Sequence, residues 1–168
     1  MQATSHFERM PIRSDEFRQI LGHWVTGVAV VASRADDGEP CGFTANSFTS
    51  LSLDPPLVLV CVDRAGNSHD CIRAAGIFAV NVLGADREVL ARRFAAVDQV
   101  GKFVDVPYSS AVTGAPVLDE AVAWVDCRVS QEYPGGDHTI FVGEVVAAGA
   151  PTGDPLIFYR GAYGRFTS

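Results

Sequence analysis

The sequence contains none of the common motifs that bind nucleotides or metals. Across its 168 residues, no Gly-x-Gly-x-x-Gly follows a strand pattern, and no Gly-Lys-Ser or Gly-Lys-Thr of a P-loop occurs. The four cysteines show neither Cys-x-x-Cys spacing nor a cysteine and histidine pattern suited to zinc. We therefore expect neither a Rossmann dinucleotide site, nor a P-loop, nor a bound metal.

Basic clusters and long hydrophobic runs are lacking as well. The chain has 13 Lys and Arg against 20 Asp and Glu, and its formal net charge of −7 leaves no basic stripe for a phosphate backbone. The longest apolar run, 57–62, is far too short to span a bilayer, and the N-terminal segment has no apolar core. These absences predict a soluble, cytoplasmic protein that binds neither nucleic acid nor a membrane.

The composition is that of an ordinary globular protein, with 48% hydrophobic and 20% charged residues. We expect one domain over residues 14–168, preceded by a polar leader over 1–13. Cys41, Cys61, Cys71 and Cys127 mostly stand among apolar residues, which is typical of buried, reduced thiols.

Three short helices are predicted. Ser14 can cap the first, and Phe17, Ile20, Leu21 and Trp24 follow at the spacing of one apolar face, so this helix is expected to lie on the core. The second is expected over 68–75 with Ser68 as its N-cap. The third follows Asp86, through the stretch REVLARRFA.

The remaining chain has the pattern of about seven or eight strands with mostly short connections. Three short helices are too few for the regular alternation of strand and helix that a parallel sheet requires. We therefore predict an antiparallel, closed or nearly closed small barrel with helices packed outside it. The clearest hairpin joins AVAWVDCRVSQEY to HTIFVGEVVAAG through Pro-Gly-Gly-Asp, and it places His138 at its mouth.

Three stretches are candidate sites, each with an ordinary structural alternative. The block from Thr44 to Ser52 is rich in small and hydroxylated residues, which would let a flat ligand approach the backbone but are also common in strands and turns. Arg64 and Ser68, at a predicted helix N-terminus, suit a phosphate, or serve only as a solvated cation and a cap. Arg92 and Arg93 could contact a second anion, or simply complement a helix C-terminus.

Taken together, these stretches resemble the flavin reductase domain family, the short-chain reductases of two-component flavin-dependent monooxygenases. The resemblance is carried by FRQILGHWVTGVAVVAS, GFTANSFTSLSLDPPLVLVCVD, FAVNVL, GAPVLDEAVAWVDCRV, GGDHTIFVGEV and PLIFYRGAYG. It runs from about Phe17 to Phe166, with the motifs in the family's order. It implies a mainly β fold, an FMN-binding split β-barrel of Greek-key type with a few short flanking helices. It also implies a homodimer that binds FMN or FAD, reduces it with NADH or NADPH, and supplies a separate monooxygenase.

The resemblance also implies roles for particular residues. His138 is similar to the histidine beside the nicotinamide, and hydride transfer between two cofactors needs no nucleophile or metal from the protein. One departure is Gly101, which stands where many relatives carry a charged residue before Lys-Phe, so we assign no cofactor contact to that segment. The cofactor-binding residues implied are Phe43, Thr44, Ala45, Asn46, Ser47 and Ser50 for the ring, Val62, Asp63, Arg64, Asn67 and Ser68 for the phosphate, Arg93 and Phe94 for a further contact, and Tyr159 and Tyr163 near the pocket.

Two other functions remain open from the sequence. The same fold could hold its flavin tightly and pass electrons to another acceptor, or it could be a non-catalytic flavin-binding or redox-sensing module. Free exchange of flavin and multiple turnovers with added flavin distinguish a flavin reductase from these two.

Overall fold

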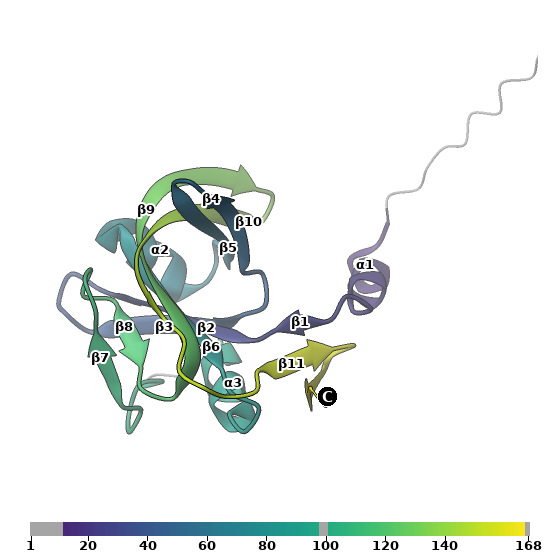
Figure 1. The fold of residues 1–168 in the computed structure, drawn as a ribbon. Helices are drawn as coiled ribbons and strands as arrows, with labels where there is room; N and C mark the ends of the chain where they lie inside the picture. Colours follow the sequence, from purple (N-terminus) through teal and green to yellow (C-terminus); the bar gives the residue numbers. More distant parts are fainter. Residues whose placement is uncertain (1–11, 98–100, 167–168) are drawn as a thin grey trace, which may run out of the picture.

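The computed structural model describes residues 12–97 and 101–166, which form twelve strands and three helices (Figure 1). The strand count is higher than the seven or eight that the sequence predicts. Two expected strands, over 27–34 and 41–50, are each divided, and two short strands over 108–110 and 116–118 were not expected. The predicted leader over 1–13, which includes His6, lies almost entirely outside the described residues. No helix among the described residues is long and apolar enough to cross a membrane.

A curled, antiparallel sheet of seven strands forms the body of the molecule (Figure 1). In sheet order its strands are β3 (Pro40–Ala45), β2 (Ala29–Arg34), β6 (Ile77–Leu83), β9 (Ala121–Gly135), β10 (His138–Gly149), β5 (Pro56–Asp63) and β4 (Thr49–Leu53). Helix α2 (Asn67–Ala75) contacts β2 and β3 from one half of the sheet and β5 from the other. One face of this helix therefore packs across the two halves of the curled sheet, and the prediction of an antiparallel barrel is confirmed.

The main core lies inside the curled sheet. Alternate residues of β5, Val58, Val60 and Val62, point into it and meet Phe78 and Phe141 from β6 and β10. All five side chains are almost fully buried. This alternation is what a strand with one face on a core requires.

A second apolar cluster packs the outer elements onto the sheet. It joins α3 (Glu88–Ala95), through Ala91 and Phe94, to Val30 of β2 and Leu156 of β11. Two small sheets complete the fold. They consist of β1 (Thr26–Gly27), β11 (Leu156–Tyr159) and β12 (Ala162–Arg165) in one, and β7 (Tyr108–Ser110) and β8 (Pro116–Leu118) in the other.

Helix α1 (Ser14–Leu21) does not lie on the core, contrary to the prediction. It projects from the body of the molecule beside β1 and β11, as Figure 1 shows, and none of its residues is buried. Phe17 and Ile20 are each about half exposed, and the Trp24 side chain that follows the helix is 74% exposed. The apolar spacing predicts the helix correctly, but spacing alone does not say what covers the apolar face.

The predicted helix caps and one predicted strand also differ from the structure. Helix α1 begins after Arg13, α2 after Gly66 and α3 after Arg87, and none of these N-caps donates or accepts a side-chain cap bond. The expected strand CGFTANSFTS is divided into β3 and β4 by a turn over 46–48. The hairpin of β9 and β10 forms as expected, but its turn is shorter than predicted, because Pro134 and Gly135 belong to β9 and only Gly136 and Asp137 connect the strands.

The prediction of four reduced cysteines is wrong for two of them. Cys41 of β3 and Cys71 of α2 form a disulfide, whereas Cys61 and Cys127 are free. The two bonded residues are 30 positions apart in the sequence. Their spacing in the sequence does not predict this pair, because the two cysteines meet only when α2 packs against β3.

We predict that reducing this disulfide lowers the free energy of unfolding by about 2–4 kcal/mol, since the cross-link closes a long loop in the unfolded chain. Urea unfolding with and without dithiothreitol measures the difference. The double variant Cys41→Ser, Cys71→Ser is the control, because its stability should not respond to the reductant. A wild-type protein whose unfolding is equally insensitive would contradict the prediction.

Candidate functional site

A cavity of about 610 Å³ opens beside the disulfide, between β3, the β5–α2 loop, the end of α3 and the segment before β7. This volume falls within the usual range for small-molecule sites. The predicted site residues in its wall are Phe43, Thr44, Val62, Asp63, Asn67, Ser68 and Phe94. The structure therefore brings together the strand block and the turn before α2, which the sequence separates by about twenty residues.

One wall of the cavity is apolar and depends on a glycine in β3. A Cβ atom on Gly42 would lie 2.9 Å from the Val31 carbonyl oxygen, 3.2 Å from the Phe103 ring and 3.3 Å from the Phe94 ring. The two phenylalanine rings pack edge to face, with their centroids 4.8 Å apart. Gly42 thus allows two aromatic side chains to close onto β3, which makes this wall of the cavity apolar.

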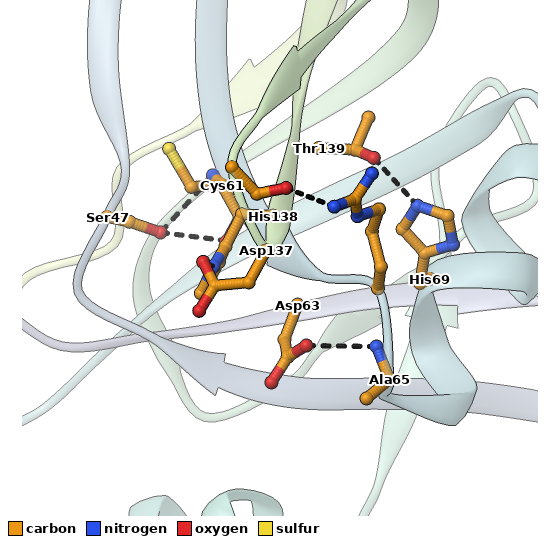
Figure 2. A network of polar contacts seen from close by, with 10 residues as sticks. Ser47, Cys61, Asp63, Ala65, His69, Asp137, His138 and Thr139 are labelled. Atoms are coloured by element: carbon orange, nitrogen blue, oxygen red, sulfur yellow. Dashed lines mark hydrogen bonds and ion pairs between the residues drawn. The ribbon is translucent and has the colours of Figure 1, made fainter.

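The opposite wall is polar and is formed by the first turn of α2. Gly66, Asn67 and Ser68 line the cavity, and Gly66 occupies the N-cap position without a side-chain cap bond. The Asp63 carboxylate accepts a hydrogen bond of 2.9 Å from the Ala65 N–H, which fixes the approach to the helix (Figure 2). Uncapped N–H groups at a helix N-terminus, together with the helix dipole, favour an anionic group.

Lys102 is the one cationic side chain among the described wall residues, and the sequence did not single it out. Its Nζ donates to the Phe94 carbonyl oxygen at 3.1 Å, at the end of α3. Partial burial lowers the pKa of Lys102 below its ordinary value. Two acidic residues, Glu39 and Asp63, share the wall. The segment around Gly101, to which we assigned no contact, therefore contributes to the cavity.

His138 lies at the start of β10, on the edge of this region but outside the cavity wall. It is paired with Asp63 of β5, and directly opposed residues of antiparallel strands face the same side of the sheet. Its Nδ1 lies 2.7 Å from Oδ1 of Asp137, whose pKa this hydrogen bond holds below its usual value. His138 therefore shares a sheet face with a cavity residue and has an oriented imidazole.

Two arginines predicted to contact a ligand instead bond to main-chain carbonyls. The Arg64 guanidinium donates to the Gly136 carbonyl oxygen, and the Arg64 N–H donates to that of Asp137 at 3.1 Å. Arg93 donates to the Val104 carbonyl oxygen at 3.0 Å. Neither side chain lines the cavity. Both brace segments that border it.

The remaining predicted residues also lie outside the cavity wall. They are Ala45, Asn46, Ser47, Ser50, Tyr159 and Tyr163. The Ser47 hydroxyl bonds both the N–H and the carbonyl oxygen of Cys61, which ties the turn after β3 to β5 (Figure 2). The Tyr163 ring lies 5.0 Å from the Arg92 guanidinium, so this pair joins the C-terminal sheet to α3.

The chain is similar to known proteins over most of its length. The flavin reductase like domain family matches residues 21–167. The chain is 45% identical to the reductase component of a 4-nitrophenol 4-monooxygenase/4-nitrocatechol 2-monooxygenase from Rhodococcus opacus, over 93% of this chain and 83% of that protein. It is 43% identical to an FMN reductase (NADH) of Agrobacterium fabrum, over 92% and 87% of the two chains.

A solved structure provides a further comparison. An NADH:FAD oxidoreductase from Streptomyces globisporus, in complex with NAD and FAD fragments, superposes with a TM-score of 0.85. It is 42% identical, and the match covers 91% of this chain and 92% of that one. The likeness thus extends over nearly the whole described fold.

Proposed function

The chain belongs to the flavin reductase like domain family, and on that premise we propose that it reduces FMN or FAD with NADH and supplies the reduced flavin to a separate monooxygenase. The observation that carries the proposal is the cavity with an aromatic wall on one side and an uncapped helix N-terminus on the other. Relatives with 45% and 43% identity are named as a monooxygenase reductase component and as an NADH-dependent FMN reductase, which supports the same reaction here.

The wall residues fit a flavin. The rings of Phe94 and Phe103, which close onto β3 at Gly42, give the cavity an apolar wall against which a flavin ring could pack. The first turn of α2 offers N–H groups to the flavin phosphate, and Lys102 supplies a positive charge in the same cavity. A bound flavin supplies the hydride acceptor, so the chain needs only to bind, orient and shield the two reactants.

His138 is proposed to position the nicotinamide and not to act as an obligatory proton donor. Its imidazole is oriented by Asp137 and shares a sheet face with Asp63 of the cavity wall. Its strand is held by hydrogen bonding on both sides, to β5 and β9. A ring fixed in this way can orient a nicotinamide at low entropic cost, which is how positioning residues accelerate a reaction between two bound groups.

We predict that the purified protein oxidises NADH over many turnovers only when FMN or FAD is added. His138→Ala should raise the apparent KM for NADH and slow flavin reduction about tenfold, since orientation is impaired while the cofactors keep their own chemistry. Flavin affinity should stay near that of the wild type. Steady-state absorbance measures the turnover and the apparent KM for NADH, and stopped-flow absorbance measures the rate of flavin reduction.

Flavin-independent oxidation, or none with either flavin, would exclude the proposed reaction. Flavin binding with a single turnover would favour a redox-sensing module, and a flavin that stays with the protein through purification would favour a tightly bound cofactor.

Lys102 gives a test of phosphate binding. We predict that Lys102→Met weakens FMN binding by about 1.5–3 kcal/mol, the range for a hydrogen bond to a charged group, and weakens riboflavin binding much less. Arg92→Gln is the matched control, because this arginine pairs with Glu88 and lies outside the cavity wall. Arg64→Ala should likewise have a smaller effect than Lys102→Met, since Arg64 bonds the hairpin turn. Fluorescence titration compares the four proteins, and equal losses for FMN and riboflavin would remove the phosphate role.

The exposed apolar face of α1 supports a homodimer. Phe17, Ile20, Leu21 and Trp24 are all exposed on an element that projects from the body of the molecule (Figure 1). An apolar face of this kind marks an association surface. We predict that light scattering gives twice the chain mass, and that the double variant Ile20→Glu, Trp24→Glu gives the mass of a monomer. Unchanged mass in the variant would place the interface elsewhere.

A further inference from the structure

We infer that His69 is a positioning residue for the nicotinamide side of the site, acting through Thr139 on the strand that carries His138. The inference rests on the proposed function, because it gives His69 a role in flavin reduction. The sequence motifs give this histidine no role of its own. It lies within α2 and does not line the cavity.

The His69 imidazole is buried and fully bonded. Its side chain is 3% exposed, Nε2 lies 2.9 Å from the Thr139 hydroxyl, and Nδ1 lies 3.0 Å from the Asp70 carboxylate. One face meets the Phe141 ring edge on, at a centroid distance of 5.6 Å. Thr139 is itself 3% exposed. A buried polar pair of this kind is costly unless it is bonded, so the bond fixes one relative placement of the two side chains.

The bond joins the two segments that the proposed reaction must hold in register. His69 directly follows Ser68, which lines the cavity, and Thr139 directly follows His138. Figure 2 shows the bond crossing from α2 to β10. Any rotation of the first turn of α2 against β10 would break it. The His69–Thr139 bond therefore sets the distance between the helix N-terminus proposed for the phosphate and the histidine proposed for the nicotinamide.

A second tie lies on the exposed side of the same loop. Arg64 donates to the carbonyl oxygens of Gly136 and Asp137, at the turn just before His138. Between the two ties, Asp63 pairs with His138 in the β5–β10 ladder. The loop and the hairpin mouth are thus held at an exposed point and at a buried point. The buried tie is the bond between His69 and Thr139, so a single substitution at either residue removes it.

The experiment is a double-variant cycle read by stopped-flow reduction of bound flavin. His69→Phe keeps an aromatic ring against Phe141 but removes the bond, and Thr139→Val removes the hydroxyl at constant shape. We expect each to slow flavin reduction about tenfold, as misplacement of a positioning group does, while Thr139→Ser stays within about twofold of the wild type. We also expect His138→Ala to cost about tenfold in the wild type but less than about twofold in the His69→Phe background, because residues that act as a unit are not additive.

Thr113→Val is the matched control. The Thr113 hydroxyl donates to the buried Asp126 carboxylate and accepts from the Ala115 N–H, and Thr113 does not line the cavity. The same substitution there should lower the unfolding midpoint without slowing flavin reduction. Additive effects of His69→Phe and His138→Ala, or a reduction rate in Thr139→Val as fast as in Thr113→Val, would overturn the inference and leave the flavin reductase function standing. A wild-type protein that does not reduce flavin would overturn both the inference and the flavin reductase function. A His138→Ala variant that reduces flavin at the wild-type rate would overturn the inference together with the role of His138.

Discussion

The packing of α2 across the two halves of the curled antiparallel sheet is the constraint on which the rest of the structure depends. Ile72 of this helix belongs to the same buried cluster as residues of β2, β5, β6 and β10, so the helix helps to close the main core. Because β3 and β5 both contact α2, the strand block after Pro40 comes to lie against the turn before the helix. The cavity, the disulfide and the helix N-terminus are all consequences of that closure.

The cavity wall has an apolar part and a polar part. The apolar part includes Gly42 and the Phe94 and Phe103 rings, and the polar part includes the first turn of α2 and Lys102 beside two carboxylates. A wall of this kind suits reactants that bring their own reactivity and need only to be bound and oriented, as a flavin and a nicotinamide do.

Local patterns predicted the elements well and their surroundings less well. The alternation in β5, the Pro-Gly-Gly-Asp turn and the apolar spacing of α1 each gave the right element, because each depends on neighbours in the chain. The exposure of Trp24, the pairing of Cys41 with Cys71 and the place of Lys102 depend on segments that meet only after folding. The seven predicted site residues that line the cavity come from three stretches of the chain, which are β3, the segment from the end of β5 to the start of α2, and Phe94 of α3. His138 is related to them only by the pairing of β10 with β5, which places it opposite Asp63.

The arginines show why residue type alone misleads about anion sites. Arg64 and Arg93 were the natural candidates, yet each donates to a main-chain carbonyl beside the cavity, where it holds a loop in place. The wall holds one lysine beside Glu39 and Asp63, so a flavin phosphate bound as proposed would be attracted by the helix N-terminus together with Lys102. A site with so few cations binds an anion without a large electrostatic gain. That balance suits a protein that must release reduced flavin to a partner, because a tightly held product would limit each turnover.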